Sequence, residues 1–459
     1  MTNPVKDAAG GLSGAGRYPD SASKSARLFE RAQRVLPGGN TRTTVYRAPY
    51  PIYARSGHGN RIVDVDGVER IDFLNNYTAL IHGHAHPSIV RAALSAVSDG
   101  SCFGVPTESE IRLAELLVDR IPGAEKVRFM NSGSEAVMMA VKAARAYTGR
   151  PKIAKCEGVY HGSYDFVEVS LDSSPASWGE SNRPNRVPYS AGTPASVLSD
   201  VVVLPFNEIE ASLRLLEENA SELAAVIVDP LPNRIGLIQA SSDYMTTLRR
   251  FCSKAGVVLI SDEVISFRVG YGGAQAEFAF QADLVALGKI IGGGFPVGAV
   301  AGRADVMAVF DPTVGKSAAP HGGTFNANPV TMAAGAAAVE LLTPTAVKDL
   351  NELGRIARDR VQAVFHEARV PWRVTGQASL FRLLPGQEPL VGYRSSWMDE
   401  TVGKQLRDFT NALLNHGILI DPGGLGCLST VMSEPEVDIL AQAVSLALSE
   451  AQLPTLETM

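Results

Sequence analysis

The stretch DLVALGKIIGGGFPVG, residues 283–298, decides how the rest of this chain is interpreted. Residues 284–287 form a short apolar run that predicts a buried strand, and Lys289 stands where that strand ends, just before a cluster of glycines. A lysine at the end of a buried strand is costly unless its ammonium group is paired or its pKa falls. A lysine whose pKa has fallen can attack a carbonyl carbon and form a Schiff base.

An aspartate ends another apolar strand upstream. Asp262 follows the run 257–261 and stands about one strand-helix-strand unit before Lys289. A Schiff-base lysine beside a buried aspartate is the pair that pyridoxal phosphate needs, because the lysine holds the aldehyde and the aspartate keeps the pyridine nitrogen protonated. The two residues therefore predict a pyridoxal phosphate site in which Lys289 and Asp262 are catalytic.

The composition is that of an ordinary globular protein and excludes several classes of partner. The chain has 459 residues, of which 45% are hydrophobic and 20% charged, enough for two or three domains or for a large domain with a smaller one. The net charge of −6 gives no basic surplus, so we expect neither a nucleic acid nor a membrane partner. The apolar residues 284–302 include a lysine, a proline and six glycines, which rules them out as a membrane span.

The cysteines and the first residues indicate a compartment. Residues 1–25 are rich in glycine, serine, alanine and aspartate, lack an apolar signal core and predict a flexible arm. The four cysteines are scattered without a CxxC pair, which indicates free thiols in a reducing compartment, and we expect a cytoplasmic protein. These cysteines are Cys102, Cys156, Cys252 and Cys427.

Apolar runs alternate with helical patterns through the middle of the chain. Continuous apolar strands separated by helices predict an α/β fold with a mainly parallel sheet covered by helices on both faces. Ligands of such sheets bind beyond the carboxyl ends of the strands. The expected strands are 126–129, 152–156, 201–204, 225–228, 257–261, 284–287 and 299–302, and the helices include 135–147, 209–219 and 244–255.

The flanking segments predict a smaller α+β unit. Residues 59–73 read as a hairpin around the Asp66-Gly67 turn, an alanine-rich helix is expected over 330–342, and another helix runs from about 351 to 368. Three units follow from this: an N-terminal arm and small-domain segment (1–75), a large cofactor-binding domain (76–342) and a C-terminal small domain (343–459).

One long segment, residues 173–199, is rich in serine, proline, asparagine and glycine. A loop of this length inside a compact domain is usually functional and often a lid.

Four motifs lie where a cofactor or substrate could bind, and each has a plainer alternative. Ser132-Gly133-Ser134 opens a helix and could bind a phosphate, or it is an ordinary serine N-cap. Tyr160, before His161 and Gly162, could stack on a flat ring, or it packs at a turn. Thr324 could donate to a phosphate or belong to a plain loop. Arg42 could bind a carboxylate bidentately or lie solvated on the surface.

Other motifs fail on their own requirements. His82, His84 and His86 alternate, but a hydrolase site would need further ligands with their own spacing, so we expect no metal centre. Gly315-Lys316-Ser317 lacks the upstream glycine of a phosphate loop, because Phe310 stands at that position. No GxGxxG follows the first strand and no GxSxG is present, which leaves dinucleotide binding and serine hydrolysis without support.

Taken together, these residues resemble the class III aminotransferases, which are fold type I pyridoxal phosphate enzymes. They are most similar to the glutamate-1-semialdehyde aminomutase branch and the β-amino-acid transaminases near it. The likeness runs from about residue 36 to 342 and more weakly to 429. It rests on the segments 64–67, 83–87, 131–136, 160–162, 262–264, 287–294 and 323–325.

The resemblance implies a role for each matching residue. Lys289 forms the Schiff base and shuttles the proton, and Asp262 pairs with the pyridinium nitrogen. Thr324 reaches the phosphate of the partner subunit, which implies a homodimer with shared active sites. Arg42 matches the substrate-carboxylate arginine of the β-amino-acid transaminases. The expected cofactor contacts are Ser132, Gly133, Ser134, Tyr160, His161, Asp229, Val264 and Thr324, with Tyr160 and Val264 on opposite ring faces.

The chain departs from the family pattern in three places. Asp229 stands before Pro230 where the family usually has glutamate. Arg234, beside Asn233, stands where the aminomutases place an asparagine. The loop 421–427 carries neither the aminomutase glutamate nor the arginine of many transaminases, which argues against strict glutamate-1-semialdehyde activity.

The resemblance implies an aminotransferase that moves an amino group from an amino acid, with β-amino acids among the expected donors, to a keto acid. An internal amino transfer of the aminomutase kind, racemisation and elimination use the same lysine and stay open. The segment 173–199 favours the aminomutase, since a lid could retain its intermediate. A non-catalytic protein that kept the fold is disfavoured by the intact Lys289 and Asp262.

Overall fold

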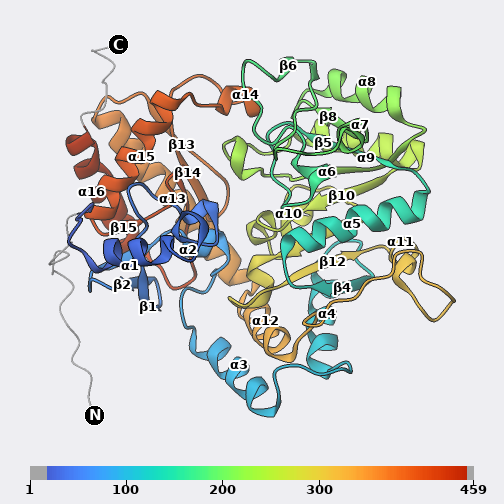
Figure 1. Cartoon of the computed structure of the whole chain (residues 1–459), viewed down its shortest axis with the longest axis horizontal. Coiled ribbons are helices and arrows are strands. Elements are labelled where there is room, and N and C mark those ends of the chain that lie inside the picture. The colour runs from blue at the N-terminus through green and yellow to red at the C-terminus, as the bar shows by residue number, and fades with distance from the viewer. Residues whose placement is uncertain (1–17, 452–459) are drawn as a thin grey trace.

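A seven-stranded sheet forms the centre of the larger part of the molecule (Figure 1). The computed structural model describes residues 18–451. The strand order is β4-β12-β11-β10-β9-β5-β8, and only β12 runs antiparallel to its neighbours. All seven expected strands are present, with ends within two residues of the predicted ones. Their bounds are β4 Lys126–Met130, β5 Lys152–Cys156, β8 Val201–Leu204, β9 Leu223–Val228, β10 Val258–Asp262, β11 Leu284–Gly288 and β12 Gly298–Gly302.

Helices cover both faces of this sheet, so its central strands are buried along their whole length. On one face α5 packs on the sheet through its alanines, and on the other α8 and α9 pack through leucine and aromatic side chains. Ser132 caps α5 by accepting from the Glu135 N–H at 3.2 Å. The helices of this part are α3 Pro87–Asp99, α4 Glu108–Arg120, α5 Gly133–Thr148, α6 Asp165–Glu168, α7 Ala195–Ser199, α8 Ile209–Asn219, α9 Ser242–Ala255, α10 Gly273–Glu277, α11 Ala304–Met307 and α12 Pro329–Leu341.

The two ends of the chain build a second structural unit, where the blue and red segments of Figure 1 lie together. Strand β15 pairs in parallel with β3, so that the expected hairpin of β2 and β3 joins a C-terminal strand in one sheet. A three-stranded sheet, β13-β14-β16, lies in the same unit. The elements are α1 Lys24–Gln33, β1 Ala54–His58, β2 Arg61–Asp64, β3 Glu69–Asp72, α2 Asn75–Thr78, α13 Pro344–Glu367, β13 Trp372–Thr375, β14 Leu380–Pro385, α14 Tyr393–Ser396, α15 Glu400–Asn415, β15 Ile418–Leu419, β16 Leu425–Cys427 and α16 Glu434–Ala451.

Two expectations need correction in detail. The helix expected from about residue 351 begins at Pro344, because Thr343 caps it by accepting from the Ala346 N–H. Residues 1–17 of the expected flexible arm lie outside the described residues, but Tyr18 is buried and donates to the carbonyl of Tyr50 at 2.5 Å. The end of the predicted arm is therefore packed structure.

The segment 173–199 carries structure of its own. It contains the hairpin of β6 (Gly179–Glu180) and β7 (Arg183–Pro184), and it ends in α7. Arg183 donates to both carboxylate oxygens of Glu218 on α8, at 2.7 and 2.8 Å. The predicted lid is thus a short hairpin fastened to the large unit.

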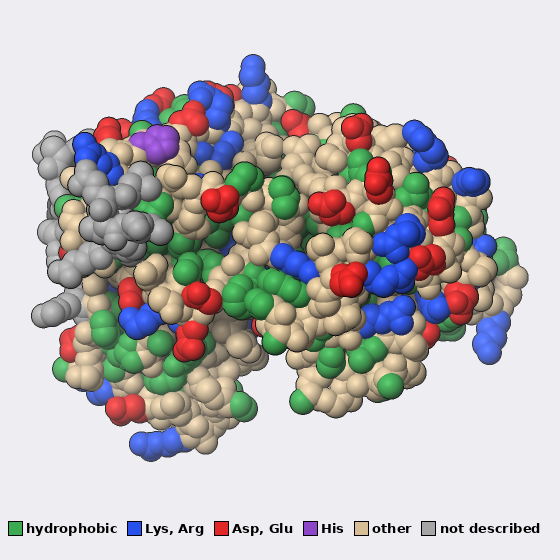
Figure 2. All heavy atoms as spheres, turned by 90° about the horizontal axis from the view of Figure 1, so that it is seen from above, with side chains coloured by type: hydrophobic (Ala, Val, Ile, Leu, Met, Phe, Trp, Pro, Cys, Tyr) green, Lys and Arg blue, Asp and Glu red, His purple; other side chains and the backbone are tan. Residues whose placement is uncertain are grey.

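Among residues 18–451, no single helix is both long and apolar enough to cross a bilayer, although α12 and α13 satisfy that composition test as a bent pair. Acidic and basic side chains are interspersed over the face shown in Figure 2.

Glycine 335 marks a close approach of backbones behind Lys289. A Cβ at Gly335, in the middle of α12, would collide with the carbonyl oxygen of Ile291, in the turn that follows β11. We expect Gly335→Ala to lower the free energy of unfolding by about 1–3 kcal/mol, because the turn would have to shift. Thermal unfolding followed by circular dichroism measures this.

Gly403→Ala in α15 is the matched control. A Cβ at Gly403 meets only the mobile end of Arg407, 3.2 Å away, so alanine should be neutral or stabilise by up to about 1 kcal/mol. Equal melting temperatures for the two variants would contradict the close packing at Gly335.

Candidate active site

The expected catalytic residues meet at one edge of the sheet. Asp262 is the last residue of β10, Lys289 follows β11, and Asp229 follows β9. These three strands are parallel neighbours, so their carboxyl ends lie side by side. His161 lies in the loop that follows β5. Since β5 is the neighbour of β9 in the sheet, this loop belongs to the same edge.

Two glycines allow the start of α5 to pack closely against the residues next to Asp262 and Lys289. A Cβ at Gly133 would lie 2.8 Å from Cγ1 of Val264, and a Cβ at Gly288 would lie 3.4 Å from both Gly133 and Val264. Next to it, Ser134 Oγ accepts from the Ser163 N–H at 3.1 Å. The first turn of α5 therefore lies against the residues that flank Asp262 and Lys289, with its N–H groups unpaired within the helix.

The carboxylate of Asp262 is buried and held from two sides. Nδ1 of His161 lies 2.8 Å from its Oδ2, and the Val264 N–H donates to its Oδ1 at 3.1 Å. Burial lowers the pKa of His161, which favours the neutral ring with Nδ1–H donating to the carboxylate. Nε2 of His161 is buried and has no hydrogen-bond partner among residues 18–451.

Burial also shifts the pKa values of the other titratable groups here. It lowers the pKa of Lys289, while the nearby charges of Asp262 and Asp229 act in the opposite direction. It raises the pKa of Asp229 well above its usual range, and the neighbouring Asp262 raises it further. The pKa of Glu263 rises to about 7, again chiefly through burial. A lysine with a lowered pKa thus faces two buried carboxyl groups.

Tyr160 and Thr324 lie farther out. Tyr160 is 45% exposed beside the buried His161, so one ring face is open. Thr324 is exposed on the rim of a pocket of about 870 Å³, formed by the loops 102–107 and 321–329. The carbonyl of Thr324 accepts from Sγ of Cys102 at 3.6 Å, and within residues 18–451 its side chain forms no hydrogen bond with the glycine-lined edge.

Arg42 is placed by an unusual turn that the sequence analysis missed. Its Nη1 donates to Oδ1 of Asn76 at 2.9 Å, and its guanidinium lies 5.9 Å from the ring centre of Tyr77. The four residues of α2, Asn75–Thr78, all have positive φ, which costs roughly 1–2 kcal/mol per residue for side chains of this kind. The adjacent residues Asn75 and Asn76 could have indicated this turn from the sequence, because asparagine tolerates the left-handed region.

Two of the three positions that depart from the family pattern, the loop 421–427 and the segment with Asn233 and Arg234, are linked through Arg382. The Tyr77 hydroxyl donates to the carbonyl of Thr44, and burial together with the nearby carboxyl of Asp421 raises the pKa of Tyr77, while burial raises the pKa of Asp421. Arg382, also missed by the sequence analysis, donates to the carbonyl oxygens of Gly423 and Asn233. Arg234 points to Asp172, with 3.3 Å between Nη2 and Oδ1. The loop 421–427 is thus bound to the segment after β9.

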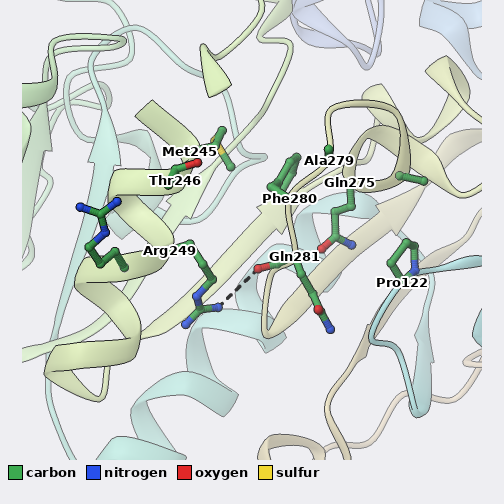
Figure 3. Close-up of a pocket in the computed structure, with 10 residues that line it drawn as sticks. Pro122, Met245, Thr246, Arg249, Gln275, Ala279, Phe280 and Gln281 are labelled. Carbon is green, nitrogen blue, oxygen red and sulfur yellow. Dashed lines mark hydrogen bonds between the residues drawn. The ribbon is translucent and has the colours of Figure 1, made fainter. Parts of the chain in front are cut away.

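Two other features lie apart from this edge. Figure 3 shows a pocket of about 610 Å³ near Pro122 and Phe280, in which Arg249 donates to the carbonyl of Gln281. It lies toward the amino-terminal ends of β10 and β11, away from Lys289. His82 bonds to Thr430 and to the carbonyl of Ala338, and His84 bonds to Asp72, so these histidines serve the packing of the fold.

The groups at the sheet edge fit pyridoxal phosphate. A buried lysine can take the aldehyde, a buried aspartate can pair with the ring nitrogen, and a glycine-lined helix start can hold the phosphate. The profile of the family Aminotransferase class-III matches residues 44–435.

The chain belongs to the class III aminotransferases.

Three relatives span nearly the whole chain. A glutamate-1-semialdehyde 2,1-aminomutase from Methanothermobacter thermautotrophicus is 38% identical over 93% of this chain and 99% of its own. An omega-transaminase from Sphaerobacter thermophilus is 55% identical, with a TM-score of 0.93 over 95% and 99% of the two chains. A β-phenylalanine aminotransferase from Variovorax paradoxus is 34% identical, with a TM-score of 0.84 over 94% and 95%.

The family membership confirms the fold type I class and the cofactor. The protein is a pyridoxal phosphate enzyme, and its mostly parallel sheet with helices on both faces is the fold expected from the sequence. The relatives include both transaminases and aminomutases, so family membership alone leaves the reaction open.

The lowered pKa of Lys289 gives a testable pH dependence. The uncharged amine is the nucleophile, and a lowered pKa makes it predominate at lower pH than in an exposed lysine. The rate at which the apoprotein captures pyridoxal phosphate covalently should rise with pH and reach half its maximum below 10.5, the ordinary value. Stopped-flow absorbance measures the rate.

Lys289→Ala is the control for this experiment, since it should bind the cofactor without a borohydride-reducible bond. A half-maximal capture rate at pH 10.5 or above in the unmodified protein would contradict the lowered pKa.

Proposed function

We propose that this protein is an aminotransferase that moves an amino group from an amino acid to a keto acid. The observation that carries the proposal is the position of Lys289 directly after β11, beside the parallel strand ends that bear the buried residues Asp262 and Asp229. The 55% identity to an omega-transaminase supports the same reaction.

Each residue of the site has a part in holding the cofactor under this proposal. Asp262 would pair with the ring nitrogen and His161 would hold Asp262 in place. The N-terminus of α5, with Ser132, Gly133 and Ser134, would bind the phosphate. Tyr160 and Val264 would contact the two ring faces.

The chemistry divides between the cofactor and the chain. Pyridoxal phosphate supplies an aldehyde that condenses with amines and a ring that accepts the electron pair of the C–H bond on the amine-bearing carbon. Lys289 Nζ would hold the aldehyde in the resting enzyme and would carry a proton to or from the amine-bearing carbon. Burial suits it for this, because a lysine with a lowered pKa spends more of its time as a free base at neutral pH.

The fastened hairpin supports transamination over internal amino transfer. An aminomutase must retain its intermediate between two half-reactions, and the segment 173–199 was the sequence feature that favoured this. Tyr393 donates to the carbonyl of Ser173, and Arg394 donates to the carbonyls of Trp178, Gly179 and Glu180, which supports a fixed segment over a lid. The aminomutase stays the second candidate because of its 38% identical relative.

Arg42 supports a donor with a carboxylate, and the β-amino acids are the class we propose. Its guanidinium has one hydrogen bond, to Asn76, within residues 18–451, which leaves further donors for a substrate carboxylate. Tyr77 and Asn76 fix its direction from the left-handed turn.

The assembly and compartment are part of the proposal. Exposed apolar side chains surround Thr324, which suits a homodimer in which each Thr324 completes the partner's phosphate site. These side chains are Phe103 and Val105, which line the same pocket as Thr324, and the adjacent Phe325. Four free cysteines suit the cytoplasm. We also propose that the domain boundaries lie at residues 75 and 342.

The reaction is tested by half-reactions with single donors. Without a keto acid, β-phenylalanine or 3-aminobutyrate should bleach the yellow holoenzyme stoichiometrically, and adding a keto acid should restore the colour. Absorbance and product analysis measure both steps. Steady consumption of a donor with no keto acid present would overturn the proposal in favour of an aminomutase, racemase or lyase.

Arg42→Ala should raise the KM for 3-aminobutyrate by roughly 10- to 100-fold, because it removes a charge-assisted hydrogen bond. The control substrate is 1-phenylethylamine, which has no carboxylate, and its KM should change little. An equal change for both substrates would show that Arg42 serves the fold and not the carboxylate.

A further inference from the structure

Helix α14 crosses from the C-terminal unit to the large sheet. Figure 1 shows it at the top of the molecule, next to β6. We name Tyr393, Arg394 and Trp397 the α14 clamp. Trp178, which precedes β6, contacts all three: its ring centre lies 6.4 Å from Tyr393 and 5.9 Å from Trp397, and the Arg394 guanidinium lies 4.9 Å above it.

Arg394 donates hydrogen bonds to two segments of the large unit. Its Nε donates to Oε2 of Glu157 at 2.9 Å, and its Nη2 reaches Oε1 at 3.3 Å. The same guanidinium donates to the carbonyl oxygens of Trp178, Gly179 and Glu180 at 2.8, 2.8 and 3.1 Å. One side chain thus binds the residue after β5 to the hairpin of β6 and β7.

Tyr393 makes a second contact at the same place. Its hydroxyl donates to the carbonyl of Ser173 at 2.5 Å, and Ser173 Oγ donates to Oε1 of Glu157 at 2.9 Å. Its ring lies directly on Gly158, where any Cβ would collide with it. Tyr393 therefore closes over the first two residues of the loop that leads to Tyr160.

Glu157 connects the clamp to the cofactor edge. It is 3% exposed and stands four residues before His161, which holds Asp262. Lys155 fastens the base of this loop, since its Nζ donates to the carbonyl oxygens of Cys156 and Val169 at 2.9 Å each. The loop 157–161 is thus held at its base by Lys155 of its own strand and on its other side by Tyr393 and Arg394 of the C-terminal unit.

Removing Arg394 would leave the buried carboxylate of Glu157 without its ion-pair partner, with Lys155 as a remaining nearby cation. Such a carboxylate is strongly unfavourable unless the surrounding chain opens to water. The chain that would open is the loop 157–161, which bears Tyr160 and His161. The clamp therefore acts on the cofactor edge across the boundary between the two units.

We propose that Arg394 and Tyr393 are positioning residues for the cofactor: they hold the loop 157–161 so that Tyr160 and His161 lie correctly on the ring and on Asp262. The position of the C-terminal unit thereby controls how firmly the large unit retains its cofactor. This inference needs only the cofactor of the family and does not depend on which amino acid is the substrate.

The test is the rate of cofactor loss from the purified holoenzyme, measured by dilution into a trap for free pyridoxal phosphate. Arg394→Ala should lose the cofactor at least about tenfold faster, since a buried carboxylate without its ion-pair partner favours the open loop. Its absorption band should also change position or pH dependence, because His161 no longer holds Asp262 firmly. Hydrogen exchange of residues 157–163 should rise with it.

Arg183→Ala is the matched control. Arg183 belongs to the same hairpin but pairs with Glu218 on α8, away from Glu157. It should leave the rate of cofactor loss within about twofold of the unmodified protein, as exposed ion pairs contribute little. Equal loss from both variants, or no faster loss from Arg394→Ala, would overturn the inference.

A double mutant separates the proposed route from a general weakening of the fold. Glu157→Gln removes the negative charge that Arg394 pairs with. Adding Arg394→Ala to this variant should therefore change the rate of cofactor loss less than it does in the unmodified protein. A full, independent effect of Arg394→Ala in the Glu157→Gln background would contradict action through Glu157.

Should Arg394→Ala fail to fold, Tyr393→Phe gives a second test, because it removes only the hydrogen bond to Ser173. It should raise the rate of cofactor loss a few-fold, about the effect of one hydrogen bond. An unchanged rate would contradict the role proposed for Tyr393.

Discussion

The burial of Asp262 beside Lys289 is the constraint on which the rest of the structure depends. A carboxylate and an amine can share a dry site only if neighbouring groups fix both. His161 and the Val264 N–H hold the carboxylate, and the turn after β11, backed by α12, sets Lys289. These neighbours follow the strands β5, β10 and β11, so the site requires these parallel strands in their observed order.

The site also requires the second structural unit, although none of its strands enters the large sheet. Arg394 brings a cation to Glu157, and the loop 421–427 brings Asp421 to Tyr77. The first contact lies behind His161 and the second lies behind Arg42. The ends of the chain, joined in one sheet by β3 and β15, therefore support the cofactor edge and the proposed substrate arginine from the same side.

Local patterns predicted the strands well and the long loop poorly. The strands 201–204 and 284–287 were recognisable because burial on both faces demands unbroken apolar runs. The segment 173–199 has the composition of a mobile loop, yet Arg394, Tyr393 and Glu218 all form hydrogen bonds with it. Those partners lie tens to hundreds of residues away, and no local pattern reveals them.

By itself the sequence determined the cofactor, the class of fold and the residues at the strand ends, because these depend on periodicity and on which side chains follow each apolar run. The resemblance to a family came from the same positions. Only the tertiary structure decided that Asn75–Thr78 form a left-handed turn beside Arg42, that Arg394 reaches Glu157, and that the predicted lid is fastened. These features depend on contacts between distant segments, whose free energies exceed the local preferences of the chain.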